Sequence, residues 1–70
     1  MIEKIGMTVE EAAGYTGIGR NTLRNLVNLG KLPALRVGRK NIIRTDVLLK
    51  FLEKNQGVNL LNFDEVRPIE

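Results

Sequence analysis

The chain has 70 residues, 43% of them hydrophobic and 27% charged, and this length fits one small globular domain with no room for a second. It contains no cysteine, histidine, tryptophan or serine, which excludes disulfide scaffolds, Cys/His zinc sites and the usual histidine, serine and cysteine catalytic groups. Because these side chains are missing, the chain is expected not to be an enzyme and to hold no metal, cofactor or small-molecule ligand. The net charge is +3, and the lack of a long apolar run or signal-peptide pattern predicts a protein of the bacterial cytoplasm that binds no membrane.

The first predicted helix begins after Thr8 and ends at Gly17. Residues 8–11, TVEE, have the capping-box pattern, in which the threonine and the second glutamate each accept a hydrogen bond from the other's backbone N–H. Gly17 provides the positive φ that commonly ends a helix. Gly14 lies inside this helix, where glycine is destabilising, so we expect another helix to cross there at close backbone approach.

The second predicted helix runs from Arg20 to Leu29, with Gly19 as its N-cap and Gly30 after its end. At about 100° per residue, its apolar side chains gather on one side, at Leu23, Leu26 and Val27. The opposite side carries only asparagine and arginine, at Asn21, Arg24, Asn25 and Asn28. Arginine pairs with guanine and asparagine with adenine in the major groove of DNA. A merely solvated surface is the alternative, but asparagine is a poor helix former, so this side is predicted to read bases.

Residues 34–45, ALRVGRKNIIRT, lose the helical period and alternate between apolar and polar positions. This alternation predicts a β-hairpin whose turn is made by Gly38, Arg39 and Lys40. The tip of the hairpin would therefore carry a glycine followed by two cations.

Thr45 is predicted to cap a third helix that runs from Asp46 to near Gln56, before Gly57. Its inward side chains are expected to be Val47, Leu48, Phe51 and Leu52. Residues 1–57 would then form the globular domain, and residues 58–70 a C-terminal tail rich in apolar side chains. Either the tail packs back on the third helix, or it docks a second copy of the chain or a partner protein.

The basic residues are concentrated in the middle of the chain. Seven of the eleven lie in residues 19–45, which contain no acidic residue, at Arg20, Arg24, Lys31, Arg36, Arg39, Lys40 and Arg44. The rest of the chain contains the other four basic residues and all eight acidic ones. An ordinary solvated surface is one explanation, but so complete a segregation is typical of a surface that binds a polyanion, usually nucleic acid.

Four pieces of the sequence follow one another in a fixed order: TVEEAA, IGRNTLRNL, GKLPA and RVGRK. Through them, residues 7–54 resemble the excisionase-family DNA-binding domain, which is related to the DNA-binding part of MerR-type regulators. The sequence departs from that family at Gly19, where a serine N-cap is frequent, and at Ile42, where a basic residue is common. The fold expected from these elements is mainly α with a small β-hairpin, a single-domain winged helix-turn-helix of three short helices and a two-stranded wing.

In this fold the second helix enters the major groove and its first turns do most of the reading. We expect contacts with base edges from Asn21, Arg24, Asn25 and Asn28. Contacts with the DNA backbone are expected from Arg20, Thr22, Arg36, Arg39, Lys40 and Arg44, because the positive end of a helix and a basic wing both favour phosphate.

The expected partner is double-stranded DNA. The expected function is that of an excisionase, an accessory protein of a mobile element that shapes DNA and thereby promotes integrase-mediated excision. A cognate integrase and cooperative self-association on DNA are the further partners that this function implies. Two alternatives stay open: a small transcriptional regulator of the same fold that binds a promoter, and an interaction module whose tail docks an integrase.

Overall fold

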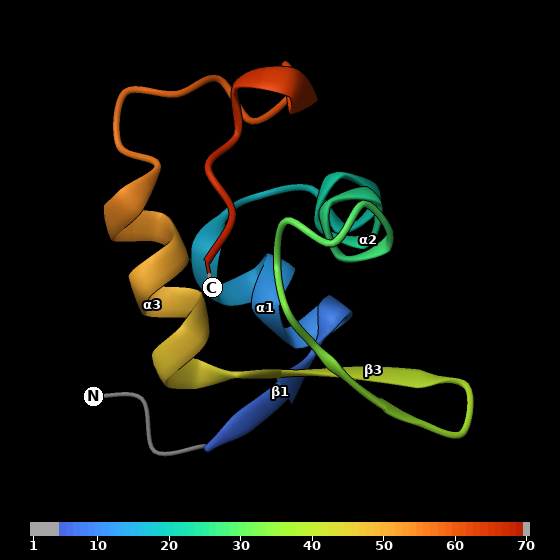
Figure 1. Ribbon diagram of the computed structural model, residues 1–70. Helices are drawn as coiled ribbons and strands as arrows, with labels where there is room; N and C mark the ends of the chain where they lie inside the picture. The colour runs from blue at the N-terminus through green and yellow to red at the C-terminus, as the bar shows by residue number, and fades with distance from the viewer. Residues whose placement is uncertain (1–4, 70) are drawn as a thin grey trace.

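The computed structural model describes residues 5–69. In chain order these residues form β1 (Gly6–Thr8), α1 (Val9–Thr16), α2 (Arg20–Asn28), β2 (Leu35–Val37), β3 (Lys40–Arg44), α3 (Thr45–Lys54) and a 3₁₀ turn η1 (Phe63–Glu65). Figure 1 shows α3 on one side of the molecule, with α2 and the hairpin of β2 and β3 on the other. The three helices and the hairpin confirm the predicted winged helix-turn-helix. No helix within residues 5–69 has both the length and the apolar character needed to cross a membrane.

The sheet has a strand that the sequence did not predict. Its order is β1-β3-β2, and β1 pairs antiparallel with β3, with Met7 opposite Ile43 and Thr8 opposite Ile42. A strand of three residues is too short to show alternation, and its partner lies far along the chain. Gly6 permits the close pairing, because a Cβ at this position would lie 2.9 Å from Cγ2 of Ile42.

The capping box of α1 is confirmed. The N–H of Glu11 donates to Oγ1 of Thr8 over 3.1 Å, and the N–H of Thr8 donates to Oε1 of Glu11 over 3.0 Å. Gly17 ends the helix with a φ of 78°. The expected close approach at Gly14 is wrong, since an added Cβ there would meet nothing within 4 Å. The helix instead packs through Val9 and Ala12, on its other side.

Thr45 is not the N-cap of α3, as the sequence suggested, but its first helical residue. Strand β3 runs straight into the helix, so Arg44 takes the cap position with an extended backbone and no capping hydrogen bond from its side chain. The N–H of Thr45 donates to the carbonyl of Ile5, just before β1, over 2.8 Å. The helix ends at Lys54, and Asn55 takes the C-cap position.

The core gathers apolar side chains from every helix, from β1 and β3, from the connection after α2 and from the tail. Its members are Met7, Val9, Ala12, Leu23, Leu26, Leu32, Ile43, Leu48, Phe51 and Val66. The predicted inward residues of α2 and α3 are confirmed for Leu23, Leu26, Leu48 and Phe51, while Val27, Val47 and Leu52 are half-buried at its edge.

The tail returns to the domain and is held there by a buried asparagine. The Asn55 side chain, in a residue 6% exposed, donates to the carbonyl of Arg67 over 2.9 Å and accepts from the N–H of Arg67 over 2.7 Å. Lys31 donates from Nζ to the carbonyl of Val66 over 3.2 Å. Together these bonds place Val66 in the core at 2% exposure, and the C-terminal segment, red in Figure 1, runs back past α3.

Candidate nucleic-acid interface

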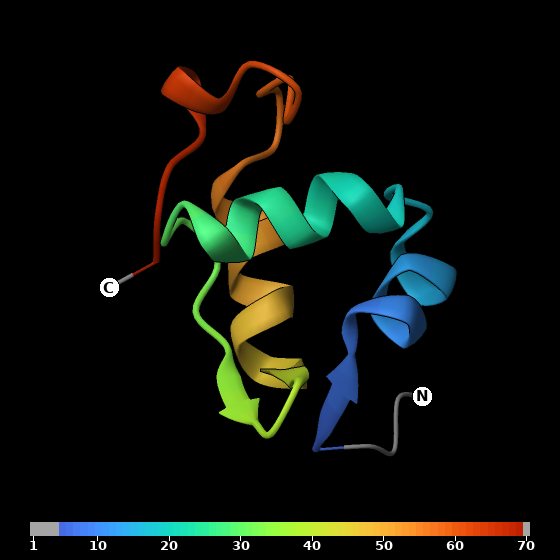
Figure 2. The ribbon, with the colours of Figure 1, turned by 90° about the vertical axis from the view of Figure 1, so that its right-hand side faces the viewer.

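The polar side of α2 is turned to solvent by the burial of its apolar side. Leu23 and Leu26 are fully buried against the core. The four residues predicted to read bases, here called the reading face, are all exposed: Asn21, Arg24, Asn25 and Asn28. Figure 2 shows α2 lying across the front of the molecule with the hairpin below it, so that no other element covers the helix from this side.

The first turn of α2 holds the two residues predicted to contact phosphate. Arg20 is exposed and Thr22 is half-buried. Gly19 occupies the N-cap position without a side chain that could accept from the first N–H groups of the helix. Those donors, together with the helix dipole, favour an anion at this end.

The hairpin of β2 and β3, here called the wing, has a turn of two residues, one fewer than predicted. Val37 pairs with Lys40, which leaves Gly38 and Arg39 in the turn and makes Lys40 the first residue of β3. Gly38 has a φ of 61°, the positive value that two-residue hairpin turns require. Arg36 stabilises the turn through a hydrogen bond, in which its Nε donates to the carbonyl of Gly38 over 2.9 Å.

The pairing register separates two arginines that the sequence grouped together. Arg36 lies opposite Asn41, on the face of the sheet that also carries the buried Ile43. Arg44 lies on the other face with Ile42, and its Nη2 pairs with Oδ2 of Asp46 at 2.9 Å. On that face Arg44 borders a mostly apolar hollow of about 210 Å³, and none of the residues that line it belongs to α2. The structure therefore does not bring Arg44 together with the other predicted site residues.

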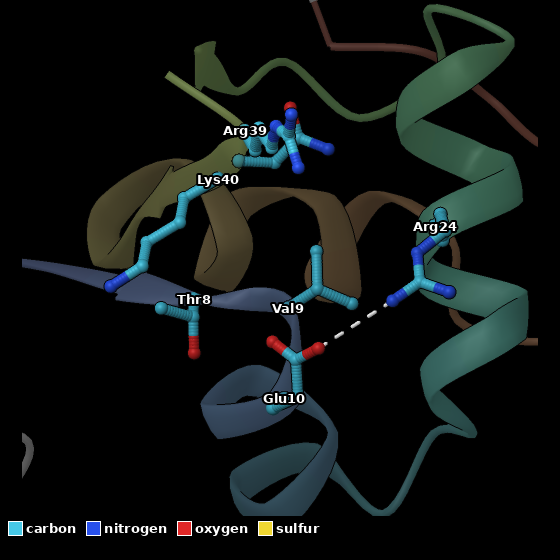
Figure 3. Close-up of a pocket in the computed structure, with 7 residues that line it drawn as sticks. Thr8, Val9, Glu10, Arg24, Arg39 and Lys40 are labelled. Atoms are coloured by element: carbon cyan, nitrogen blue, oxygen red, sulfur yellow. Dashed lines mark hydrogen bonds and ion pairs between the residues drawn. The ribbon is translucent and has the colours of Figure 1, made fainter. Parts of the chain in front are cut away.

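A polar cleft of about 240 Å³ lies between the N-terminus of α1, the middle of α2 and the wing (Figure 3). Its lining consists of Thr8, Val9, Glu10, Arg24, Arg39, Lys40 and Asn41. The cleft thus brings Arg24 of the reading face together with the two cations of the wing, Arg39 and Lys40.

Four residues of this cleft were not predicted as site residues, Thr8, Val9, Glu10 and Asn41, and of these only Glu10 and Asn41 have polar side chains without a separate predicted role. Glu10 was read only as part of the segment that starts α1, yet its Oε2 lies 3.5 Å from Nη2 of Arg24. Asn41 was read only as part of a strand. No local pattern could assign either residue to the cleft, because each faces α2 only when the wing and α1 pack around it.

The arrangement suits a double helix. An α-helix with its side chains is about 10–12 Å across, which matches a major groove about 12 Å wide. With α2 in the groove, the wing and the first turn of α2 carry cations toward the flanking phosphates, while asparagine and arginine donors face the base edges.

In the comparison with protein families, the model of the helix-turn-helix domain matches residues 7–56. The matched span runs from β1 through the end of α3 and includes the reading face, the wing and every residue of the cleft. Comparison with curated proteins and with solved structures found no match.

Proposed function

Because this chain belongs to the helix-turn-helix domain family, which supports binding to double-stranded DNA, we propose that it recognises specific duplex sequences by inserting α2 into the major groove. The observation that carries the proposal is the reading face: three asparagines and an arginine, all exposed, on a helix without an acidic residue. The burial of Leu23 and Leu26 on the opposite side fixes this face outward.

Roles follow from position along α2 and the wing. Asn21 and Arg24 lie nearest the N-terminal end and read base edges first, with Asn25 and Asn28 further along the groove. Arg20 and Thr22 hold a phosphate at the positive end of the helix. Arg36, Arg39 and Lys40 contact the backbone from the wing. Arg44 is left out of this interface because it lies at the end of β3 next to α3, where its guanidinium pairs with Asp46.

Binding is expected to weaken steeply with salt. Each phosphate contact adds about 0.9 to the magnitude of the slope of log affinity against log salt concentration, so about three to six contacts give a magnitude of about 3 to 5. The double variant Arg39→Ala with Lys40→Ala should bind every duplex more weakly and lower that magnitude by about 2. Fluorescence anisotropy on labelled duplexes over a salt series measures both effects.

The matched control for the wing variant is Lys50→Ala, which removes a cation from the exposed side of α3 and should leave the slope near that of the wild type. If the DNA affinity of the wild-type protein did not depend on salt, DNA binding through this surface would be contradicted. If the double variant had the salt slope of the wild type, the wing would not be part of the DNA-binding interface.

We further propose that the biological role is that of an excisionase, which promotes integrase-mediated excision by architecture. The resemblance of residues 7–54 to the excisionase family supports this role. A module of this size covers only a few base pairs, so several copies on adjacent repeats would be needed for useful affinity, and they would bend the DNA between them.

An excision assay tests the role. With a cognate integrase, product is expected to form only when this protein is present, and circularly permuted duplexes carrying its site should migrate as bent DNA. Excision that proceeds equally without the protein, together with unbent DNA at saturation, would instead favour a transcriptional regulator that uses the same surface at a promoter.

A further inference from the structure

Glu10 is the sole carboxylate among the residues that line the cleft. Figure 3 shows it reaching from α1 toward Arg24 on α2, with Arg39 and Lys40 on the wing side. The neighbouring Glu11 points elsewhere, because its Oε1 accepts from the N–H of Thr8 in the capping box. Glu10 is therefore the negative charge that α1 presents to the reading face.

Stability does not account for this placement. The Glu10 and Arg24 side chains are 58% and 47% exposed and their closest atoms are 3.5 Å apart. An exposed ion pair of this kind adds little to the free energy of unfolding. In a cleft lined by three cations that faces DNA, however, a carboxylate repels every phosphate that approaches.

The ion pair also restricts what Arg24 can do. A guanidinium has five N–H donors, so a contact through Nη2 leaves enough donors for a paired contact with guanine. The same contact draws the group toward α1 and places a negative charge where a phosphate bound by Arg24 would lie. Arg24 is thereby favoured for a base edge over the backbone.

We propose that Glu10 is a specificity-determining residue, which positions Arg24 for a guanine and weakens binding to DNA that lacks it. This inference rests on the proposed function, since it needs Arg24 at the base edges. Glu10 acts in two ways, through Arg24 on the preferred site and through repulsion of phosphate on every other sequence. The result is a larger ratio between specific and nonspecific affinity, obtained at the expense of total affinity.

The test begins with selection of preferred sites by the wild-type protein from a library of random duplexes. The variant Glu10→Gln keeps the size of the side chain and removes its charge. We expect it to bind random duplex about three- to tenfold more tightly, with a steeper salt dependence. The selected sites should lose their preference for guanine at one position, and the ratio of specific to nonspecific affinity should fall by a similar factor.

Glu53→Gln is the matched control, because it removes the same charge from the exposed side of α3 and should leave the ratio and the base preference unchanged. In a background of Arg24→Ala, the change at Glu10 should no longer alter base preference at that position. Thermal unfolding of each variant confirms that the fold is retained.

Two outcomes would overturn the inference alone. In one, Glu10→Gln tightens binding equally on the selected site and on random duplex; in the other, Glu53→Gln has the same effect as Glu10→Gln. A wild-type protein that selects no sequence from the library would contradict the proposed function itself, and the inference about Glu10 with it.

Discussion

A protein shortened after Gly57 is expected to lose its folded structure at 25 °C. Truncation removes Val66, which is 2% exposed within the core, and burial of a valine side chain contributes about 1.5–3 kcal/mol. It also removes Arg67, whose backbone satisfies the side chain of Asn55. Asn55 keeps the bond from Nδ2 to the carbonyl of Phe51, but its Oδ1 loses the donor, and a buried acceptor left without a partner costs about 1–3 kcal/mol. These losses match the few kcal/mol of net stability, about 3–5, that a core of this size provides.

Circular dichroism and urea unfolding measure this effect. Single variants separate the contributions of the tail to the free energy of unfolding. Val66→Ala should lower it by about 2 kcal/mol, because two methyl groups are lost and a cavity is left. Asn55→Ala should lower it by about 1–3 kcal/mol, because backbone groups of Arg67 lose their partner. Leu61→Ala is the control, since this tail residue is 71% exposed and should unfold like the wild type. A truncated protein with the wild-type unfolding midpoint would show that the contacts of the tail contribute nothing.

The folding role of the tail affects how docking can be tested. An integrase or second copy that binds the tail cannot be probed by truncation, because the domain would unfold at the same time. Leu61, exposed between Leu60 and η1, is the apolar position to change instead, and docking through the tail remains a prediction that Leu61→Ala tests.

Arg24→Ala and Asn21→Ala are each expected to weaken binding to the selected site by about 1–3 kcal/mol, a factor of about 5 to 150. Binding to random duplex should change little, because a base contact is made only where its base is present. Both side chains are exposed on α2, so their removal should leave the unfolding midpoint close to that of the wild type. Fluorescence anisotropy on selected and random duplexes at one salt concentration measures the difference.

Asn62→Ala and Lys50→Ala serve as controls, since they remove an exposed amide and an exposed cation away from the reading face. Their affinities should equal that of the wild type on both duplexes. If Arg24→Ala or Asn21→Ala weakened binding equally on selected and random DNA, the residue would contact the backbone, and the assignment of α2 as the reading helix would rest on the remaining asparagines.

The sequence by itself determined the elements whose signals are local. The capping box of α1 joins residues three positions apart, and the positive φ at Gly17 and Gly30 belongs to single residues. The outward face of α2 follows from its period, because burying Leu23 and Leu26 leaves the asparagines on the opposite side. The hairpin follows from alternation and a glycine at its turn. These features were enough to predict the winged helix-turn-helix and the composition of the reading face.

Only the tertiary structure decided what depends on contacts between distant parts of the chain. The pairing of β1 with β3 is one such contact, and just before β1 the carbonyl of Ile5 accepts from the N–H of Thr45, which is the first residue of α3 and not its N-cap. The register of the wing is another, since it set Arg44 on the face away from Arg36. The hydrogen bonds of Asn55 to Arg67 and the approach of Glu10 to Arg24 join residues twelve and fourteen positions apart. No local pattern encodes such pairs, because each forms only when several elements pack around one core.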